Sequence, residues 1–181
     1  MSIACYIIFF TGAAEEDFIQ AVLIGVMSDT HDDMRMIRRA VRFLNSAGVD
    51  FVLHAGDIVS PFTFEELGKL KAGFAAVFGN NDGDKILLRE KSKNRVFNQP
   101  LIKEFSGRKF VVFHEPDRAF LSARSGEFDV VVYGHTHRPE IKKIGAALLL
   151  NPGKVAALLE GKSTLALVET ETLRARIADI P

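Results

Sequence analysis

Residues 21–31 read AVLIGVMSDTH, and this stretch decides the fold. The apolar run Ala21–Met27 has the length of a buried strand, and the residues that follow it directly are polar. Apolar residues then recur at helical spacing over Met34–Leu44, behind two aspartates that favour a helix N-terminus and ahead of Gly48. The stretch predicts a strand, a polar loop and a helix, in that order.

The same alternation continues along the chain. We predict further strands over Phe51–Leu53, Phe74–Phe78, Lys109–Phe113 and Asp129–Tyr133, and helices over Phe62–Leu70, with Pro61 at its start, and Asp117–Ser125. Strands that alternate with helices indicate an α/β core. Short strands without helices between them follow in the last third, at Glu140–Ile144, Ala146–Leu150, Leu165–Glu169 and Ala175–Ala178. They predict antiparallel pairing, and hence a mixed or second sheet.

The length of 181 residues suits one domain, and the chain has no repeat and no long linker. We expect a single domain over residues 21–181 and interpret residues 1–20 as an N-terminal extension, a strand or packed arm without a catalytic role. A misassigned upstream start is the alternative. The apolar stretch Ile3–Phe10 is too short to span a bilayer and lacks the basic region of a secretory signal, but it leaves a homodimer contact open.

The composition limits which binding partners and which cellular compartment are expected. Lys+Arg and Asp+Glu are equal at 23 each, so no global field draws the protein to a membrane, and nucleic acid is not indicated as a partner. Four arginines, at positions 35, 38, 39 and 42, crowd one predicted helix, which we interpret as a solvated face. Cys5 is the single cysteine, so an internal disulfide cannot form, and we expect a cytoplasmic protein.

Polar residues that can bind metals follow nearly every strand of the α/β part. These clusters are Ser28-Asp29-Thr30-His31, His54-Ala55-Gly56-Asp57, Gly79-Asn80-Asn81-Asp82, His114 and Gly134-His135-Thr136-His137. Ligands of open α/β sheets bind at the carboxyl ends of the strands. Each cluster alone is explained as well by a turn or by a buried histidine, but together they predict one site.

Carboxylate, amide and imidazole groups suit Mn²⁺, Fe, Ni²⁺ or Zn²⁺, and the clusters offer no thiolate. In extended backbone, Asp29 and His31 would point to one face, and so would His135 and His137. One carboxylate can bridge two cations about 3.5–4 Å apart, which clamp a phosphate and activate a shared water. We therefore expect a site with two metal ions.

The order D-x-H, G-D, G-N, H and G-H-x-H resembles the calcineurin-like metallophosphoesterase superfamily. The matching residues are Asp29-Thr30-His31, Gly56-Asp57, Gly79-Asn80, His114 and Gly134-His135-Thr136-His137. The resemblance runs from Ala21 to about Gly153, includes the turn Asn151-Pro152-Gly153, and is greatest to the small phosphodiesterase subgroup. It implies two packed mixed sheets with helices outside, a four-layer sandwich.

The resemblance also implies the roles of the site residues. The first metal would take Asp29, His31, Asp57 and His137, and the second would take Asp57, Asn80, His114 and His135, so that Asp57 bridges them. Mn²⁺ or Ni²⁺ are the first candidates, with Zn²⁺, Fe or Mg²⁺ as alternatives. The catalytic residues would be Asp57, Asn80, Asn81 and His135, with a metal-bridging hydroxide that attacks phosphorus.

Two positions depart from the family pattern. Many family phosphatases have a histidine after the Gly-Asn pair, thought to protonate the leaving group, and this chain has Asn81. An amide has no proton to donate near pH 7, which favours diesters with acidic leaving groups. Glu115 stands where many relatives have glycine; we interpret it as a solvated loop residue, with orientation of His114 as the alternative. His54 is interpreted as a buried, hydrogen-bonded histidine, with support of a neighbouring ligand as the alternative. Asp82 is interpreted as a loop cap, with shaping of the phosphate pocket as the alternative.

The sequence therefore predicts a metal-dependent phosphodiesterase. Phosphomonoesterase action is one alternative. A non-catalytic protein-binding scaffold, like the retromer subunit of this fold, is another, but a scaffold would be expected to have lost metal-ligating histidines, and all are present here. A nuclease is a third, without support from the net charge.

Overall fold

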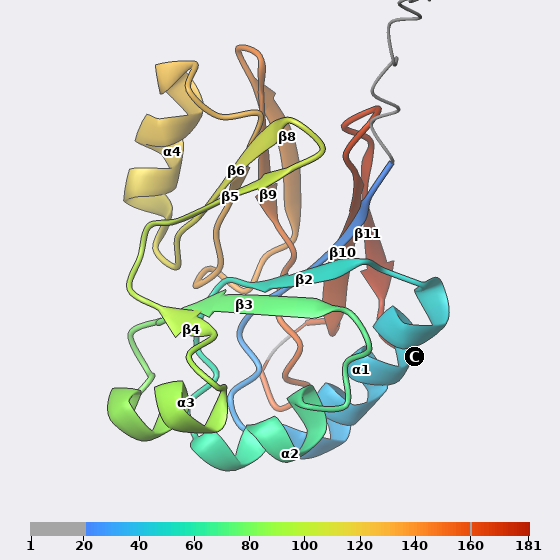
Figure 1. The fold of residues 1–181 in the computed structure, drawn as a ribbon, viewed down its shortest axis with the longest axis vertical. Helices are drawn as coiled ribbons and strands as arrows, with labels where there is room; N and C mark the ends of the chain where they lie inside the picture. Colours follow the sequence, from blue (N-terminus) through green and yellow to red (C-terminus); the bar gives the residue numbers. More distant parts are fainter. Residues whose placement is uncertain (1–20, 160) are drawn as a thin grey trace, which may run out of the picture.

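The structure, a computed structural model, describes residues 21–159 and 161–181, so the predicted N-terminal extension lies outside the described part. Two mixed sheets pack face to face, and helices cover their outer faces (Figure 1). The predicted α/β architecture is confirmed. A single domain over residues 21–181 stays a prediction.

The six-stranded sheet has the order β11-β10-β1-β2-β3-β4. Strands β1 to β4 are parallel to one another, whereas β10 is antiparallel to both β1 and β11. The bounds are Leu23–Met27 (β1), Phe51–His54 (β2), Gly73–Val77 (β3), Val96–Phe97 (β4), Thr164–Glu169 (β10) and Ala175–Asp179 (β11).

The five-stranded sheet has the order β5-β6-β7-β9-β8. Its central strands β6, β7 and β9 are parallel, and β5 and β8 pair antiparallel at the two edges. The bounds are Leu101–Phe105 (β5), Arg108–Val112 (β6), Val130–Val132 (β7), Glu140–Ile144 (β8) and Ala147–Asn151 (β9). The antiparallel pairing predicted for the last third is thus present in both sheets.

Three apolar clusters define four layers. Buried residues of both sheets, among them Val26, Phe110 and Val132, fill the space between the sheets. Helices α1 (Met34–Ala47), α2 (Phe64–Leu67) and α3 (Lys85–Lys91) pack on the six-stranded sheet, and α4 (Pro116–Ser125) packs on the five-stranded one (Figure 1). Both sheets are covered on both faces, which explains why their central strands read as continuous apolar runs.

Helix α1 begins and ends where the sequence predicts. Asp33 caps its start by accepting a hydrogen bond from the Met36 backbone N–H at 3.1 Å. At its end Gly48 adopts a φ of 66°, a left-handed conformation that glycine adopts without steric cost. The apolar face between these caps is buried against the sheet, so the caps and the apolar periodicity act together.

The predicted helix over Phe62–Leu70 is wrong in length. A 3₁₀ turn (Pro61–Thr63) and the short α2 replace it, because the backbone after Gly68 forms only tight turns, with Lys69 N–H bonded to Glu66 and Leu70 N–H bonded to Leu67. The prediction also missed α3, β4 and β5. These elements are short or half exposed, and their apolar periodicity is correspondingly weak.

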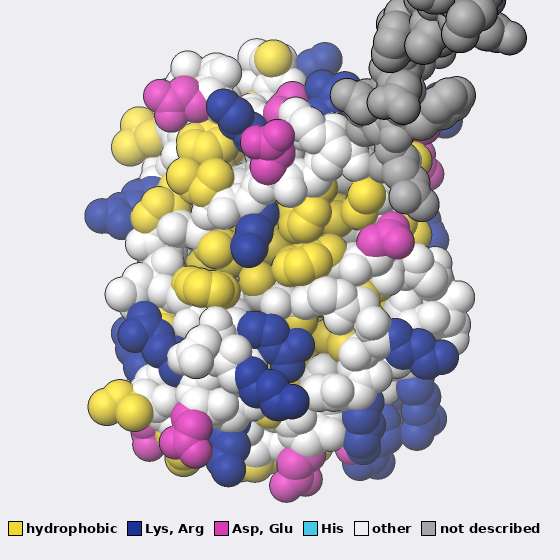
Figure 2. Space-filling view, viewed as in Figure 1, with side chains coloured by type: hydrophobic (Ala, Val, Ile, Leu, Met, Phe, Trp, Pro, Cys, Tyr) yellow, Lys and Arg dark blue, Asp and Glu magenta, His cyan; other side chains and the backbone are white. Residues whose placement is uncertain are grey.

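Lys and Arg side chains gather over α1 in Figure 2, and apolar side chains cross the middle of the same face. The four α1 arginines are exposed, as the solvated-face interpretation expects, and two of them also make surface contacts. Arg38 donates to Glu66 at 2.8 Å, and Arg39 donates to the Pro181 carbonyl at 2.9 Å. Within the described ranges, no helix is both long and apolar enough to cross a membrane.

Candidate metal centre

The residues that follow β1, β2, β3, β6 and β7 meet at one edge of the sandwich. All predicted ligands lie there in a continuous chain of contacts: Asp29, His31, Asp57, Asn80, His114, His135 and His137. No histidine is visible on the face drawn in Figure 2, so the centre does not open there.

The backbone that presents these side chains is not extended, so the expected strand-like geometry is wrong. Asp29, His31, Asp57, His135 and His137 have φ angles of 53°, 39°, 58°, 66° and 58°. Such left-handed conformations are uncommon outside glycine and mark strained backbone, which concentrates at functional sites. The loops are tied together instead, since the Asp29 N–H bonds to Gly56 O at 3.0 Å and the His31 N–H to Asp57 O at 3.1 Å.

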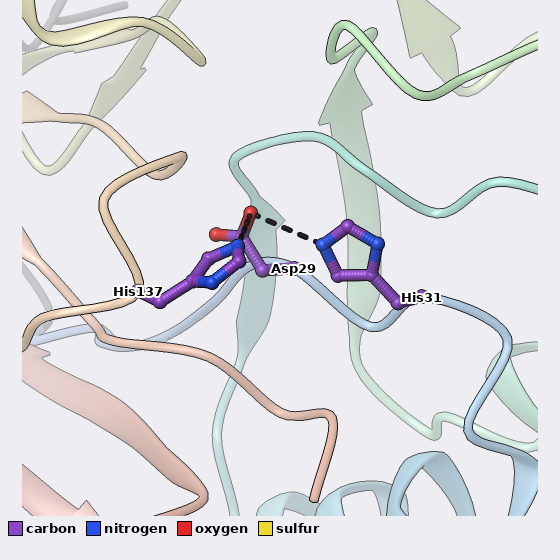
Figure 3. Close-up of side chains that lie close together, drawn as sticks. All are labelled: Asp29, His31 and His137. Carbon is purple, nitrogen blue, oxygen red and sulfur yellow. Dashed lines mark ion pairs between the residues drawn. The ribbon is translucent and has the colours of Figure 1, made fainter. Parts of the chain in front are cut away.

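Asp29, His31 and His137, here called the Asp29 group, form the first half of the centre. Figure 3 shows the two imidazoles approaching the carboxylate from different loops. Oδ1 of Asp29 lies 3.3 Å from Nε2 of His137 and 3.7 Å from Nε2 of His31. Oδ1 of Asp29 and Nε2 of His31 are buried and have no hydrogen-bond partner among the residues that the structure describes. Buried polar atoms normally have partners, so this pair needs an explanation.

Asn80, His114 and His135, here called the Asn80 group, form the second half. Oδ1 of Asn80 lies 2.8 Å from Nε2 of His114 and 2.9 Å from Nδ1 of His135. Nδ1 of His114 donates to the Ala55 carbonyl at 2.7 Å. In the neutral ring this bond leaves a lone pair on Nε2, directed at the amide oxygen of Asn80.

Asp57 lies between the two groups and touches both. Its Oδ2 is 3.5 Å from Nε2 of His31 and 3.4 Å from Nε2 of His114. Asn81 holds the same carboxylate twice, through its backbone N–H on Oδ1 at 2.8 Å and its side-chain Nδ2 on Oδ2 at 2.7 Å. Burial raises the pKa of Asp57, but the hydrogen bonds from His114 and Asn81 outweigh it and lower the pKa below its usual range.

This donor set fits divalent cations. Ligand atoms about 2.0–2.2 Å from a cation are themselves about 3–3.5 Å apart, close to the separations within both groups. Cations would also account for the unpartnered atoms of Asp29 and His31. Asp29 and Asp57 each belong to a set of carboxylate and imidazole atoms close enough to hold an ion.

Comparison with known proteins identifies the architecture. The model of the calcineurin-like phosphoesterase superfamily domain matches residues 22–173. The chain belongs to this superfamily. A phosphodiesterase of Methanocaldococcus jannaschii is 36% identical over 82% of this chain and 93% of its own length.

Solved structures agree with this assignment. The structure of an archaeal phosphodiesterase superposes with a TM-score of 0.81 at 34% identity, covering 87% of this chain and 99% of that chain. Vps29 from Entamoeba histolytica has a TM-score of 0.62 at 19% identity, covering 88% of this chain and 99% of that chain, which shows a shared fold alone. This metallophosphoesterase is therefore a hydrolase of phosphate esters.

Two buried histidines of the metallophosphoesterase site have opposite pKa shifts. Burial lowers the pKa of His114, but its hydrogen bond and charge interaction with Asp57 outweigh burial and raise the pKa to about 9. Burial lowers the pKa of His54 to about 4. At neutral pH His54 is therefore uncharged.

His54 is buried and hydrogen-bonded, as the sequence predicts. Its Nδ1 accepts from the Gly56 N–H at 3.1 Å, so Nε2 carries the proton and donates to Thr30 Oγ1 at 3.3 Å. Thr30 Oγ1 in turn donates to Asp57 O at 3.2 Å. His54 thus joins the loop of Asp29 to the loop of Asp57, a connection that sequence reasoning missed.

Asp82 and Glu115 both support the ligand loops. Asp82 is buried and accepts from the backbone N–H groups of Val59 and Gly79, so its interpretation as a loop cap is confirmed. The interpretation of Glu115 as purely solvated is wrong. Glu115 accepts from Gln99 Nε2, and Gln99 Oε1 accepts from the His114 N–H at 2.8 Å. Glu115 therefore acts on the backbone of His114 through Gln99, close to the alternative interpretation that it orients His114, although the sequence did not indicate Gln99.

Glycines of the G-N and G-H-x-H motifs have a packing role. A Cβ on Gly79 would lie 2.2 Å from Oδ1 of Asp57, and one on Gly134 would lie 2.1 Å from Oγ of Ser28 and 2.9 Å from Oδ2 of Asp29. Only glycine leaves room for the two carboxylates at these positions. The motif glycines are therefore required by the ligands that press against them.

Proposed function

We propose that this metallophosphoesterase hydrolyses phosphodiesters with two divalent cations. The cations would be held by Asp29, His31, Asp57 and His137 and by Asp57, Asn80, His114 and His135. The observation that carries the proposal is the place of Asp57, whose Oδ2 lies within 3.5 Å of an imidazole nitrogen from each group. Identity of 36% to the Methanocaldococcus jannaschii phosphodiesterase supports the diester substrate.

When bound, two such cations polarise the phosphoryl oxygens and supply an activated water. The chain's own residues orient the ligands for this task. Asn81 fixes both oxygens of Asp57, and Ala55 O holds His114 in the tautomer that presents Nε2 to the centre. Positions fixed in advance lower the reorganisation that the reaction requires.

Asn81 favours diesters over monoesters. Its amide is committed to Asp57 and has no proton to give to a departing alkoxide near pH 7. Diesters whose leaving group is an acidic alcohol or phenol do not need that proton. We therefore expect high activity with acidic leaving groups and low activity with simple alkyl phosphates.

The test is a metal and substrate panel. The purified chain is stripped of metal, and Mn²⁺, Ni²⁺, Mg²⁺ or Zn²⁺ is added back before hydrolysis of bis(p-nitrophenyl) phosphate and p-nitrophenyl phosphate is measured. We expect hydrolysis to require metal, to be fastest with Mn²⁺ or Ni²⁺, and to be faster for the diester. Faster hydrolysis of the monoester would favour a phosphomonoesterase. Inactivity with every metal would favour the scaffold.

A further inference from the structure

A cavity of about 670 Å³ adjoins the metal centre through His137. The segment Thr136–Pro139 forms one wall, and Leu159, Lys162 and the β11 residues Ile177 and Asp179 form others. His137 belongs to both places, since its Nε2 lies 3.3 Å from Asp29 while its ring lines the cavity. The volume is in the range of sites for small organic molecules, about 300–1,000 Å³.

A buried lysine fixes one wall of this cavity. Lys154 is fully buried, and its Nζ donates to Ala156 O at 2.8 Å and to Gly161 O at 3.2 Å. An ammonium group is buried only where hydrogen bonds compensate for lost solvation. These bonds connect the backbone on both sides of Leu159, and Lys162 follows directly. Hydrogen bonds therefore hold this wall of the cavity in place.

The cavity combines apolar surface with one available positive charge. Pro139, Leu159 and Ile177 supply the apolar part. Lys162 already forms an exposed ion pair with Asp179 at 2.8 Å. Arg138 is exposed and makes no hydrogen bond or ion pair with any residue that the structure describes. A free guanidinium beside apolar walls suits a carboxylate or phosphate on an organic group.

We propose that this cavity binds the second ester arm of the substrate, and that the arm is a bulky organic group ending in an anionic substituent. The inference rests on the proposed function, because a diester bound at the metal centre has one arm to release and another to accommodate. His137 places the cavity beside the reacting phosphorus, and Arg138 receives the anionic end. The arm is of the size of an aryl or nucleoside group.

Substrates with a common leaving group test the proposal. Three p-nitrophenyl phosphodiesters are compared, in which the second arm is methyl, phenyl or 4-carboxyphenyl. We expect kcat/KM to rise in that order, with the carboxyphenyl diester best. If the methyl and phenyl diesters are hydrolysed and the carboxyphenyl diester is not preferred, the cavity assignment is wrong and the proposed function remains. If no diester is hydrolysed with any metal, the proposed function itself is wrong.

Arg138→Gln identifies the residue responsible. We expect the ratio of kcat/KM for the carboxyphenyl and phenyl diesters to fall about tenfold, the size of one charge-assisted hydrogen bond. A ratio cancels any general effect on the neighbouring ligand His137. The matched control is Arg124→Gln, an exposed arginine on α4, which should leave the ratio unchanged. An unchanged ratio in Arg138→Gln would assign the preference elsewhere and overturn the role of Arg138.

A binding measurement independent of turnover uses the absence of tryptophan from the sequence. Leu159→Trp places the only tryptophan in the cavity wall, and Leu121→Trp places it on the exposed face of α4 as the control. Titration of the metal-stripped full chain with 4-carboxyphenyl phosphate should quench the first variant in a saturable way and leave the second unaffected. Equal responses of both variants would contradict binding in the cavity.

Discussion

The two halves of the metal centre differ in what holds them together. In the Asp29 group, Oδ1 of Asp29 and Nε2 of His31 are buried and form no hydrogen bond within the described part of the chain. In the Asn80 group, the ligand atoms already contact one another at 2.8–3.3 Å, and Ala55 O orients His114. We therefore expect one half to depend on a cation to satisfy its polar atoms, whereas contacts within the protein arrange the other half. Preorganised ligands bind more tightly, so we expect the Asn80 group to bind the first cation.

Asp57→Asn should have the largest effect, because it weakens both halves together. The variant keeps the size of the side chain but removes the charge shared by the two groups. We expect kcat to fall on the order of 10³-fold or more, with loss of at least one bound cation. Activity and metal content are measured against Asp117→Asn, an exposed aspartate on α4. Retention of activity by Asp57→Asn would rule out the bridging role.

Replacing one histidine from each half tests whether the two groups bind separate cations. His31→Gln should weaken the looser cation and leave the tighter one, whereas His135→Gln should weaken the tighter one. We expect a loss of affinity of about 100-fold at one site in each variant. Calorimetric titration with Mn²⁺ measures both sites. If the two variants lose the same site, the centre does not consist of two separate groups.

The strands and the ligand clusters at their ends were predictable because both follow from local pattern. An apolar run such as Val130–Val132 is buried on both faces, and the polar residues after it fall at the sheet edge whatever the loop geometry. The order of the motifs then indicated which side chains would meet. The backbone geometry of the loops was not predictable, since left-handed Asp29 and His135 are stabilised by contacts with distant residues.

The residues that hold the ligands in position could not be predicted from the sequence either. Gln99 reaches the His114 backbone from the segment between β4 and β5, where the periodicity predicts no element. Asn81 was considered only as the residue that replaces the expected leaving-group acid, although it also holds Asp57. Such contacts depend on tertiary packing rather than on spacing along the chain.

Alanine substitutions at two glycines test how closely the protein packs against the carboxylates of the two halves. Gly79→Ala presses on Asp57, and Gly134→Ala presses on Ser28 and Asp29. We expect each to lower the free energy of unfolding by about 1–3 kcal/mol and kcat by up to about 100-fold, because the carboxylates must shift. The control is Gly83→Ala, whose added Cβ meets nothing within 4 Å. Urea unfolding and kinetics are measured on all three, and equal behaviour of Gly83→Ala would remove the packing explanation.

His54, which joins the loop of Asp29 to the loop of Asp57, provides a prediction about pH-dependent stability. Its pKa is about 4 in the folded state against about 6.5 unfolded, so between these values the unfolded state binds more protons and stability falls as pH falls. From pH 7 to pH 5 we expect His54 to account for a loss of about 2 kcal/mol in the free energy of unfolding. His54→Gln should lose less than the wild type over the same interval. Parallel pH profiles would mean that His54 does not remain neutral in the fold.

Asn81→His has the smallest expected effect. It tests whether residue 81 can both hold Asp57 and protonate the leaving group. The new imidazole supplies an acid near pH 7, while the backbone N–H of residue 81 can still bind Oδ1 of Asp57. We expect the rate with poor leaving groups to rise about tenfold relative to that with p-nitrophenolate. A series of aryl esters measures this as a weaker dependence of log kcat on leaving-group pKa. Asn81→Ala removes the side-chain bond to Asp57 without adding an acid, so its rates should fall for every leaving group with the dependence unchanged. If Asn81→His behaves like Asn81→Ala, position 81 serves the carboxylate alone, and the preference for acidic leaving groups has another origin.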